Sequence, residues 1–257
     1  IQSVICRRCS VIMNAQKFQT NANTIFGRFV QTIEESINTA ERTPYSSDLT
    51  SLIQESEKRR VWADSILAQL ENVIQPNPAL RVEDFILKGM DRKKVRLSAN
   101  EQLGESMDHI GCLINETSRG GEALRKCAAA QKKIGESERR LQDTVSSEYI
   151  SWLRLFTTNE VKVAKQEREK LENARLDLDR LKTMQKRAKN DKQHEHDQLV
   201  KEAQSKFASQ CAITKQVLQE SIDKFDSQKD ELRKLLTAQS DYFRACSEAV
   251  DSALRAI

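Results

Sequence analysis

The sequence predicts an all-α protein, built as an elongated antiparallel bundle of three long helices. The first observation is that its 257 residues contain only 7 glycines and 3 prolines, and none of either after Gly135. Sheets and barrels need many more turn-forming residues. The second is that 31% of the residues are charged and 38% hydrophobic, which is typical of amphipathic helices sharing a thin core. The third is that apolar residues recur at spacings of three or four. Together they argue against a compact globular enzyme.

The first helical pattern runs from about residue 24 to residue 74, and Pro44 inside it predicts a bend. The pattern stops at Gln75-Pro76-Asn77-Pro78, because proline cannot continue a helix and restricts the residue before it. Trp62 lies on the apolar stripe of this helix, and Trp152 lies on that of a later one. We expect both tryptophans to be buried anchors of the core.

A short segment with clustered apolar residues, 79–98, follows the prolines. Helical sequence resumes at about residue 101 and ends before Ser118-Arg119-Gly120-Gly121, which is the clearest turn signal in the chain. One continuous helix is predicted from about residue 122 to residue 188, and a third from about 198 to 255 with heptad-like apolar spacing.

Between these last two helices lies the polar run 190–197, where His194 and His196 are expected in an exposed loop. The interrupted first helix is too short to cover the whole length of the other two. Part of their apolar surface is therefore expected to contact a second copy of the chain, which predicts a homodimer.

Positive charge is concentrated in three segments. Residues 1–28 carry a net charge of +4, residues 81–96 carry +3 and residues 180–192 carry +5. Because the whole chain carries +4, the remaining 200 residues carry −8. A solvated helix face explains any one such run. Three of them favour a shared basic surface.

Several classes of site are not expected. No window approaches the ~18 to 20 apolar residues that a membrane-spanning helix needs. Cys6 and Cys9 have CxxC spacing but lack a companion pair, so neither a metal site nor a redox site is predicted. Phosphate-binding, nucleophile-elbow and zinc-protease motifs are missing from the sequence, so no catalytic residue, metal or cofactor is predicted. The scattered cysteines favour a reducing, cytosolic compartment.

An amphipathic pattern lies near the N-terminus, where Phe18, Ile25, Phe26 and Phe29 recur at helical spacing among polar residues. Such a helix suits a membrane interface. The same pattern would equally serve a helix that packs on the bundle.

Five sequence motifs together resemble the N-BAR domain of endophilins, with the B-type endophilins nearest, over about residues 14–255. They are Gln75-Pro76-Asn77-Pro78, Arg81-Val82-Glu83-Asp84-Phe85, Asp91-Arg92-Lys93, the run from Lys126 to Gly135, and Arg175-Leu176-Asp177-Leu178-Asp179.

The resemblance implies a BAR domain that forms a crescent-shaped homodimer. Residues 1–25 would be a flexible amphipathic segment that becomes helical on a membrane, and residues 26–257 the BAR domain with an insert at about 75–98. Two regions depart from the family: residues 1–12 match nothing in it, and 113–117 lack the usual Gly/Pro turn. Proline-rich partners would require an SH3 domain outside this chain.

Residue by residue, the resemblance and the charge pattern predict three groups of membrane-binding side chains. They are Lys17, Phe18, Ile25 and Phe26 in the N-terminal helix; Phe85, Ile86, Lys88, Arg92, Lys93 and Lys94 in the insert; and Arg180, Lys182, Lys186, Arg187, Lys189 and Lys192 near the end of the long helix.

The predicted function is that of a non-enzymatic, peripheral scaffold that binds anionic phospholipid membranes and senses or generates curvature in membrane trafficking such as endocytosis. A passive coiled-coil scaffold that contacts only proteins is the alternative, and it would tolerate neutralisation of the basic segments. Nucleic-acid binding is not expected, because aromatic residues for base stacking are missing beside the 180–192 segment.

Overall fold

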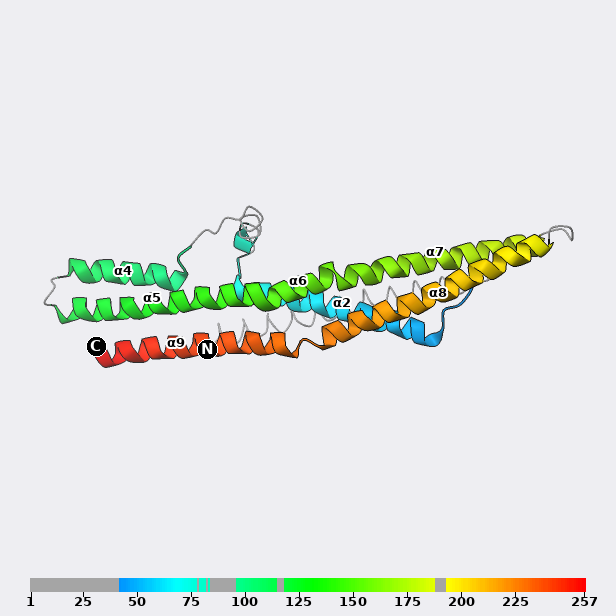
Figure 1. Cartoon of the computed structure of the whole chain (residues 1–257). Helices are drawn as coiled ribbons and strands as arrows, with labels where there is room; N and C mark the ends of the chain where they lie inside the picture. Colours follow the sequence, from blue (N-terminus) through cyan, green and yellow to red (C-terminus); the bar gives the residue numbers. More distant parts are fainter. Residues whose placement is uncertain (1–41, 78, 82, 84–95, 115–117, 188–192) are drawn as a thin grey trace, which may run out of the picture. The chain divides into compact units, whose positions relative to one another are not determined.

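A computed structural model describes residues 42–77, 79–81, 83, 96–114, 118–187 and 193–257. Over these residues the secondary structure is helical and includes no β-strand, so the predicted all-α class is confirmed (Figure 1). The elements are α2 (Ser47–Ile74), α4 (Ala99–Leu113), α5 (Arg119–Val145), the π-helical turn η1 (Ser146–Ile150), α6 (Ser151–Thr158), α7 (Glu160–Arg187), α8 (Gln193–Asp226) and α9 (Lys229–Ala256).

The helices form two compact units, and the divisions fall inside α2, α6 and α8. Unit 1 contains α2 as far as Trp62, α7, and α8 as far as Phe225. Its core is made by one apolar stripe from each of the three helices, which is how long amphipathic helices bury their surface. The buried members are Leu49, Ile53, Ala164, Leu171, Leu178, Val200, Ala203, Phe207 and Leu218.

Unit 2 contains the rest of α2, α4, α5, η1, most of α6, and α9. Within it α5 packs against both α4 and α9. The α4–α5 contact is close because glycines line it: a Cβ added at Gly104 would lie 2.9 Å from the Ala128 carbonyl oxygen. A capping box at Ser98 and Glu101 fixes the start of α4.

The predicted turn at 118–121 is wrong. Helix α5 begins at Arg119, so both glycines belong to its first turn. Gly121 is buried against α4, and an added Cβ would lie 3.0 Å from the Gly111 carbonyl oxygen. Glycine is present here because the two helices approach closely.

The first helix and its tryptophan also differ from the prediction. Helix α2 begins at Ser47, so Pro44 precedes it instead of bending it, and the earlier part of the predicted helix lies outside the described residues. The helix ends at Ile74, as the prolines predicted. Trp62 is 47% exposed, because the neighbouring Ala63 occupies the buried stripe.

The helix predicted over 122–188 is interrupted by η1 and again between α6 and α7. A π-turn holds an extra residue per turn, which rotates everything after it. The buried position that Trp152 was expected to fill is therefore taken by Leu153, and Trp152 is half-buried, with its ring stacked 6.0 Å from that of Phe156.

The third predicted helix is in fact two helices, α8 and α9, separated at residues 227–228. Gln228 in this break accepts a hydrogen bond of 2.7 Å from the Tyr149 hydroxyl in η1. Helix α8 starts at Gln193, so the histidines lie in a helix and not in a loop: His194 is exposed and His196 is half-buried.

Candidate functional site

Four of the sixteen residues predicted to face a membrane are described, and all four lie at the carboxyl end of α7. Arg180 and Lys186 are exposed, Lys182 is half-buried, and Arg187 is the last residue of the helix. The remaining twelve stay predictions, because they lie outside the described residues: Lys17, Phe18, Ile25, Phe26, Phe85, Ile86, Lys88, Arg92, Lys93, Lys94, Lys189 and Lys192.

Lys182 is held within unit 1. Its ammonium group donates a hydrogen bond of 2.8 Å to Thr43 Oγ1. Lys186 follows one turn later on the same side of α7 and is exposed. Cations at a helix carboxyl end also complement the helix dipole. The described members of the predicted cluster therefore lie on the last turns of one helix, and Lys182 also has a role inside the protein.

We call residues 42–46, which precede α2, the strap. The backbone N–H and the hydroxyl of Thr43 both donate to Asp179 Oδ1, at 3.0 and 2.6 Å. Tyr45 donates its hydroxyl to Glu172 Oε2 at 2.7 Å. Two side chains on one face of α7 therefore fasten the strap at two points.

Arg175 lies between these two carboxylates and is 4% exposed. Its Nε donates to Glu172 at 3.0 Å and its Nη1 to Asp179 Oδ2 at 3.1 Å. The hydrogen bond with Glu172 raises the pKa of Arg175, and the same bond lowers the pKa of Glu172. Burial, followed by the bond to Glu172, raises the pKa of Tyr45. A buried guanidinium needs such partners, and both shifts favour the ionised forms of Arg175 and Glu172.

The motif at 175–179, on which the family resemblance partly rests, is therefore a packing motif. Arg175 and Asp179 hold the strap, and Leu178 is buried in the unit 1 core. Leu176 and Asp177 are exposed. The spacing of Arg175 and Asp179, four apart around a core leucine, was the only sequence signal for this network.

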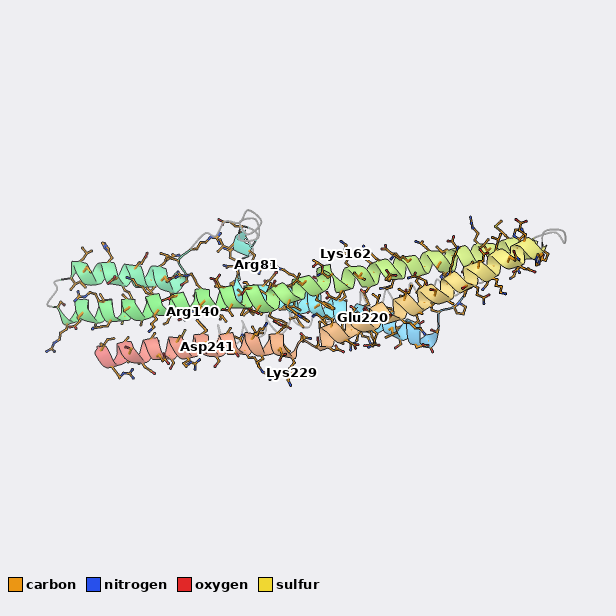
Figure 2. The ribbon with its side chains drawn as sticks, viewed as in Figure 1. Arg81, Arg140, Lys162, Glu220, Lys229 and Asp241 are labelled. Atoms are coloured by element: carbon orange, nitrogen blue, oxygen red, sulfur yellow. The ribbon has the colours of Figure 1, made fainter. Side chains whose placement is uncertain are left out.

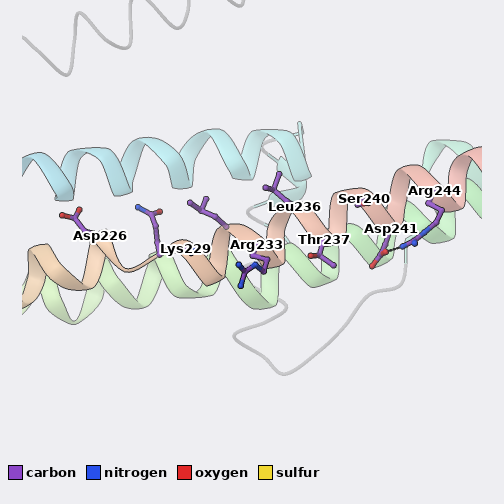
Figure 3. A pocket seen from close by; sticks show the side chains of 10 residues that line it. Asp226, Lys229, Arg233, Leu236, Thr237, Ser240, Asp241 and Arg244 are labelled. Atoms are coloured by element: carbon purple, nitrogen blue, oxygen red, sulfur yellow. Dashed lines mark hydrogen bonds and ion pairs between the residues drawn. The ribbon is translucent and has the colours of Figure 1, made fainter.

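Helix α9 in unit 2 carries a separate feature, an exposed apolar stripe. Leu236 is 64% exposed and Phe243 is 66% exposed, whereas Ala249, on another side of the helix, is buried. A groove of about 900 Å³ runs along this helix, and Leu236 lies on its wall with Arg233 and Arg244 (Figure 3). The exposed stripe consists of Leu232, Leu236, Phe243, Val250, Leu254 and Ile257.

Helix α4 has the same unusual pattern. It buries Glu101, Gly104 and Gly111, while Ile110 and Leu113 are exposed. A surface helix normally buries its apolar side and exposes its polar side. Two helices of unit 2 therefore present apolar surface that the rest of the described chain leaves uncovered, and such surface marks an interaction site.

A sequence profile of the BAR domain matches residues 18–255. The chain belongs to the BAR-domain family. It is 33% identical to endophilin-B1 of Homo sapiens over 235 residues, which span 91% of this chain and 64% of that protein. It is 28% identical to endophilin-B2 of Homo sapiens over 264 residues, which span 91% of this chain and 67% of that protein. The predicted resemblance to B-type endophilins is confirmed.

A solved structure supports the BAR fold independently. The chain is similar to a BAR protein from Galdieria sulphuraria, with a TM-score of 0.59 and 13% identity, over 82% of this chain and 98% of that one. Within the described residues, no helix is long and apolar enough to cross a membrane. The same residues contain no group of three or more His, Cys, Asp or Glu side chains arranged to hold a metal ion.

Proposed function

We propose that this BAR-domain chain is a non-enzymatic scaffold that binds anionic phospholipid membranes from the cytoplasmic side and senses or generates curvature in membrane trafficking. Membership of the BAR family over residues 18–255 carries the proposal. It is supported by the concentration of positive charge in residues 1–28, 81–96 and 180–192 of a chain that is elsewhere acidic.

The scaffold acts as a homodimer, the crescent that the endophilin resemblance implies. The exposed apolar sides of α4 and α9 are the surface that a second copy would cover. An isolated exposed apolar residue needs no explanation, but a stripe of such residues along a helix does. A second copy of the chain would cover this stripe, because a two-fold interface places the same apolar surface on both partners.

Membrane attraction then follows from charge. Each Lys or Arg close to an anionic surface contributes about 1 kcal/mol. Arg180 and Lys186 are exposed on α7, and a dimer would present two copies of every such side chain. Many weak contacts of this kind give strong binding without a lipid-specific pocket.

Charge reversal at the carboxyl end of α7 tests the proposal. We expect Lys186→Glu with Arg187→Glu to abolish most co-sedimentation with anionic vesicles, while the dimer stays folded by circular dichroism. The matched control is Lys162→Glu with Lys165→Glu, which makes the same change at two exposed residues of the same helix outside the basic segments (Lys162 is labelled in Figure 2). The control should keep most of the binding.

Salt concentration and vesicle composition provide a second test of the proposal. Wild-type binding should weaken steadily as salt rises, because the screening length falls to about 8 Å near physiological ionic strength. Equal binding to neutral and anionic vesicles would contradict the electrostatic mechanism. Unchanged binding by the Lys186/Arg187 variant would instead favour a passive coiled-coil scaffold or the helix-dipole role of these cations.

A further inference from the structure

The strap contains an unusual dipeptide, Thr43-Pro44. The chain has only three prolines, and the other two follow Gln75 and Asn77. Thr43 is therefore the only serine or threonine in the whole sequence that directly precedes a proline. Protein kinases of the proline-directed class require this dipeptide around the hydroxyl that they phosphorylate.

The local backbone suits such an enzyme. The strap is not helical, and Arg42, Pro44 and Ser46 are exposed. A kinase binds its substrate as an extended segment, so no helix has to unfold first. Thr43 itself is half-buried, and its hydroxyl becomes available when its bonds to α7 open locally.

Charged side chains surround the Thr43 hydroxyl, so a phosphate added there would change the interactions that hold the strap. The Thr43 hydroxyl donates to Asp179 at 2.6 Å and accepts from Lys182 at 2.8 Å. The groups around it carry both signs of charge: Asp179 and Glu172 are acidic, and Arg175, Lys182 and the adjacent Arg42 are basic. A phosphate would remove the donated hydrogen bond and add about −1.5 to −2 charge beside the Asp179 carboxylate.

We propose that Thr43 is a phosphorylation site for a proline-directed kinase, and that its modification detaches the Thr43 end of the strap from α7 and weakens attraction to anionic membranes. Tyr45 keeps the other end in place through its bond to Glu172 and its ring, which stacks 6.2 Å from that of Phe207. The effect on membranes rests on the function proposed above, because the phosphate lies beside Lys182 in the 180–192 segment.

The chemical step is a phosphoryl transfer from ATP. Thr43 Oγ1 forms a bond to the γ-phosphorus, the bond from that phosphorus to the bridging oxygen of ADP breaks, and the hydroxyl proton passes to the catalytic base of the kinase. The products are phosphothreonine and ADP, and no oxidant or reductant is involved.

The experiment treats the purified chain with a mitogen-activated protein kinase and ATP and maps phosphate by mass spectrometry. We expect one phosphate, at Thr43, in the wild type, and none in Thr43→Val or in Pro44→Ala, which keeps the hydroxyl but loses the recognition element. Failure to phosphorylate folded wild type, or equal phosphorylation of Pro44→Ala, would overturn the inference.

Two further readouts test the consequence. Hydrogen exchange at the Thr43 amide, which is bonded to Asp179, should accelerate on phosphorylation. The affinity for anionic vesicles should fall about fivefold or more, because the phosphate offsets the attraction of about one cation, worth about 1 kcal/mol. Thr43→Val loses the hydroxyl without gaining charge, and its affinity should stay within twofold of wild type. An equal loss in Thr43→Val, or unchanged exchange in the phosphorylated chain, would contradict the charge mechanism. If the unmodified chain did not bind anionic vesicles, the proposed function would be wrong. Phosphate mapping and hydrogen exchange would still test whether Thr43 is phosphorylated and whether phosphorylation detaches the strap.

Discussion

The two units differ in how completely they bury their apolar side chains. In unit 1, three helices enclose a shared core, and Leu49, Leu171 and Leu218 are at most 1% exposed. In unit 2, the outer helices α4 and α9 expose apolar residues: Leu113 is 73% exposed and Phe243 is 66% exposed. Among the described residues, unit 1 therefore encloses a shared core, whereas unit 2 leaves two apolar helix sides uncovered, and these are the sides that we propose contact a second copy.

The largest expected effect comes from charging the unit 2 surface. Leu236→Glu with Phe243→Glu would bury two unpaired carboxylates from each copy in the proposed interface, at a total cost of about 4 kcal/mol or more. Self-association should weaken by more than about 1,000-fold, measured by analytical ultracentrifugation. Helical content should persist, because both side chains are exposed within the single chain.

The matched control is Val163→Glu, which charges an exposed apolar residue of unit 1 that is 44% exposed. It should leave the dimer intact. Equal loss of association in both variants would remove the distinction between the units.

The next effect concerns the complete core of unit 1. Leu171→Ala should lower the free energy of unfolding by about 3 kcal/mol, since it leaves a cavity among three packed helices. Leu176→Ala, on the same helix but 48% exposed, should cost less than about 1 kcal/mol. Urea unfolding followed by circular dichroism measures both, and comparable losses would mean that unit 1 is not closed around its core.

Alanine substitution at two glycines of unit 2 should change the stability of the fold in opposite directions. Gly104→Ala places a Cβ 2.9 Å from the Ala128 carbonyl oxygen, which cannot move aside as a flexible side chain could, and should cost about 1 to 3 kcal/mol. Gly120→Ala meets nothing nearer than Ser118 Oγ at 3.7 Å and should stabilise α5 by up to about 1 kcal/mol. Thermal unfolding of the two variants measures the change in Tm, and a change in the same direction for both would refute the close α4–α5 contact.

The smallest effect is a pH dependence at the strap. The bond from Arg175 lowers the pKa of Glu172, so this carboxylate stabilises the fold above its ordinary pKa of about 4.3 and loses that contribution as pH falls below it. Because Glu172 is 45% exposed, we expect only a few tenths of a kcal/mol. Wild type should exceed Glu172→Gln in stability at pH 7 and match it near pH 3. A constant difference across this range would argue against the ion pair.

Sequence periodicity predicted the helices well and their interruptions poorly. The end of α2 at Ile74 followed from prolines, whose effect is local. The π-turn before Leu153 and the break at 227–228 contain no glycine or proline, so no local residue signal marks them in the sequence. Gly121 was misread for a related reason, because glycine serves close helix contacts as well as turns.

The candidate site was only partly predictable. Charge counting located the 180–192 segment, because clustered cations are visible in the sequence itself. The bond from Lys182 to Thr43 was not predictable, because it joins residues 139 positions apart and exists only once α7 packs beside the strap.

We expect a dimer made through unit 2 to present the basic segments to a membrane, and a binding isotherm on anionic vesicles is the decisive experiment. Wild type and the Leu236→Glu, Phe243→Glu variant would be titrated under identical salt. Two linked copies bind together with a high effective concentration, so the monomeric variant should bind at least about tenfold more weakly while its basic residues are unchanged. Equal affinity of the two proteins would show that membrane binding does not depend on a dimer made through unit 2.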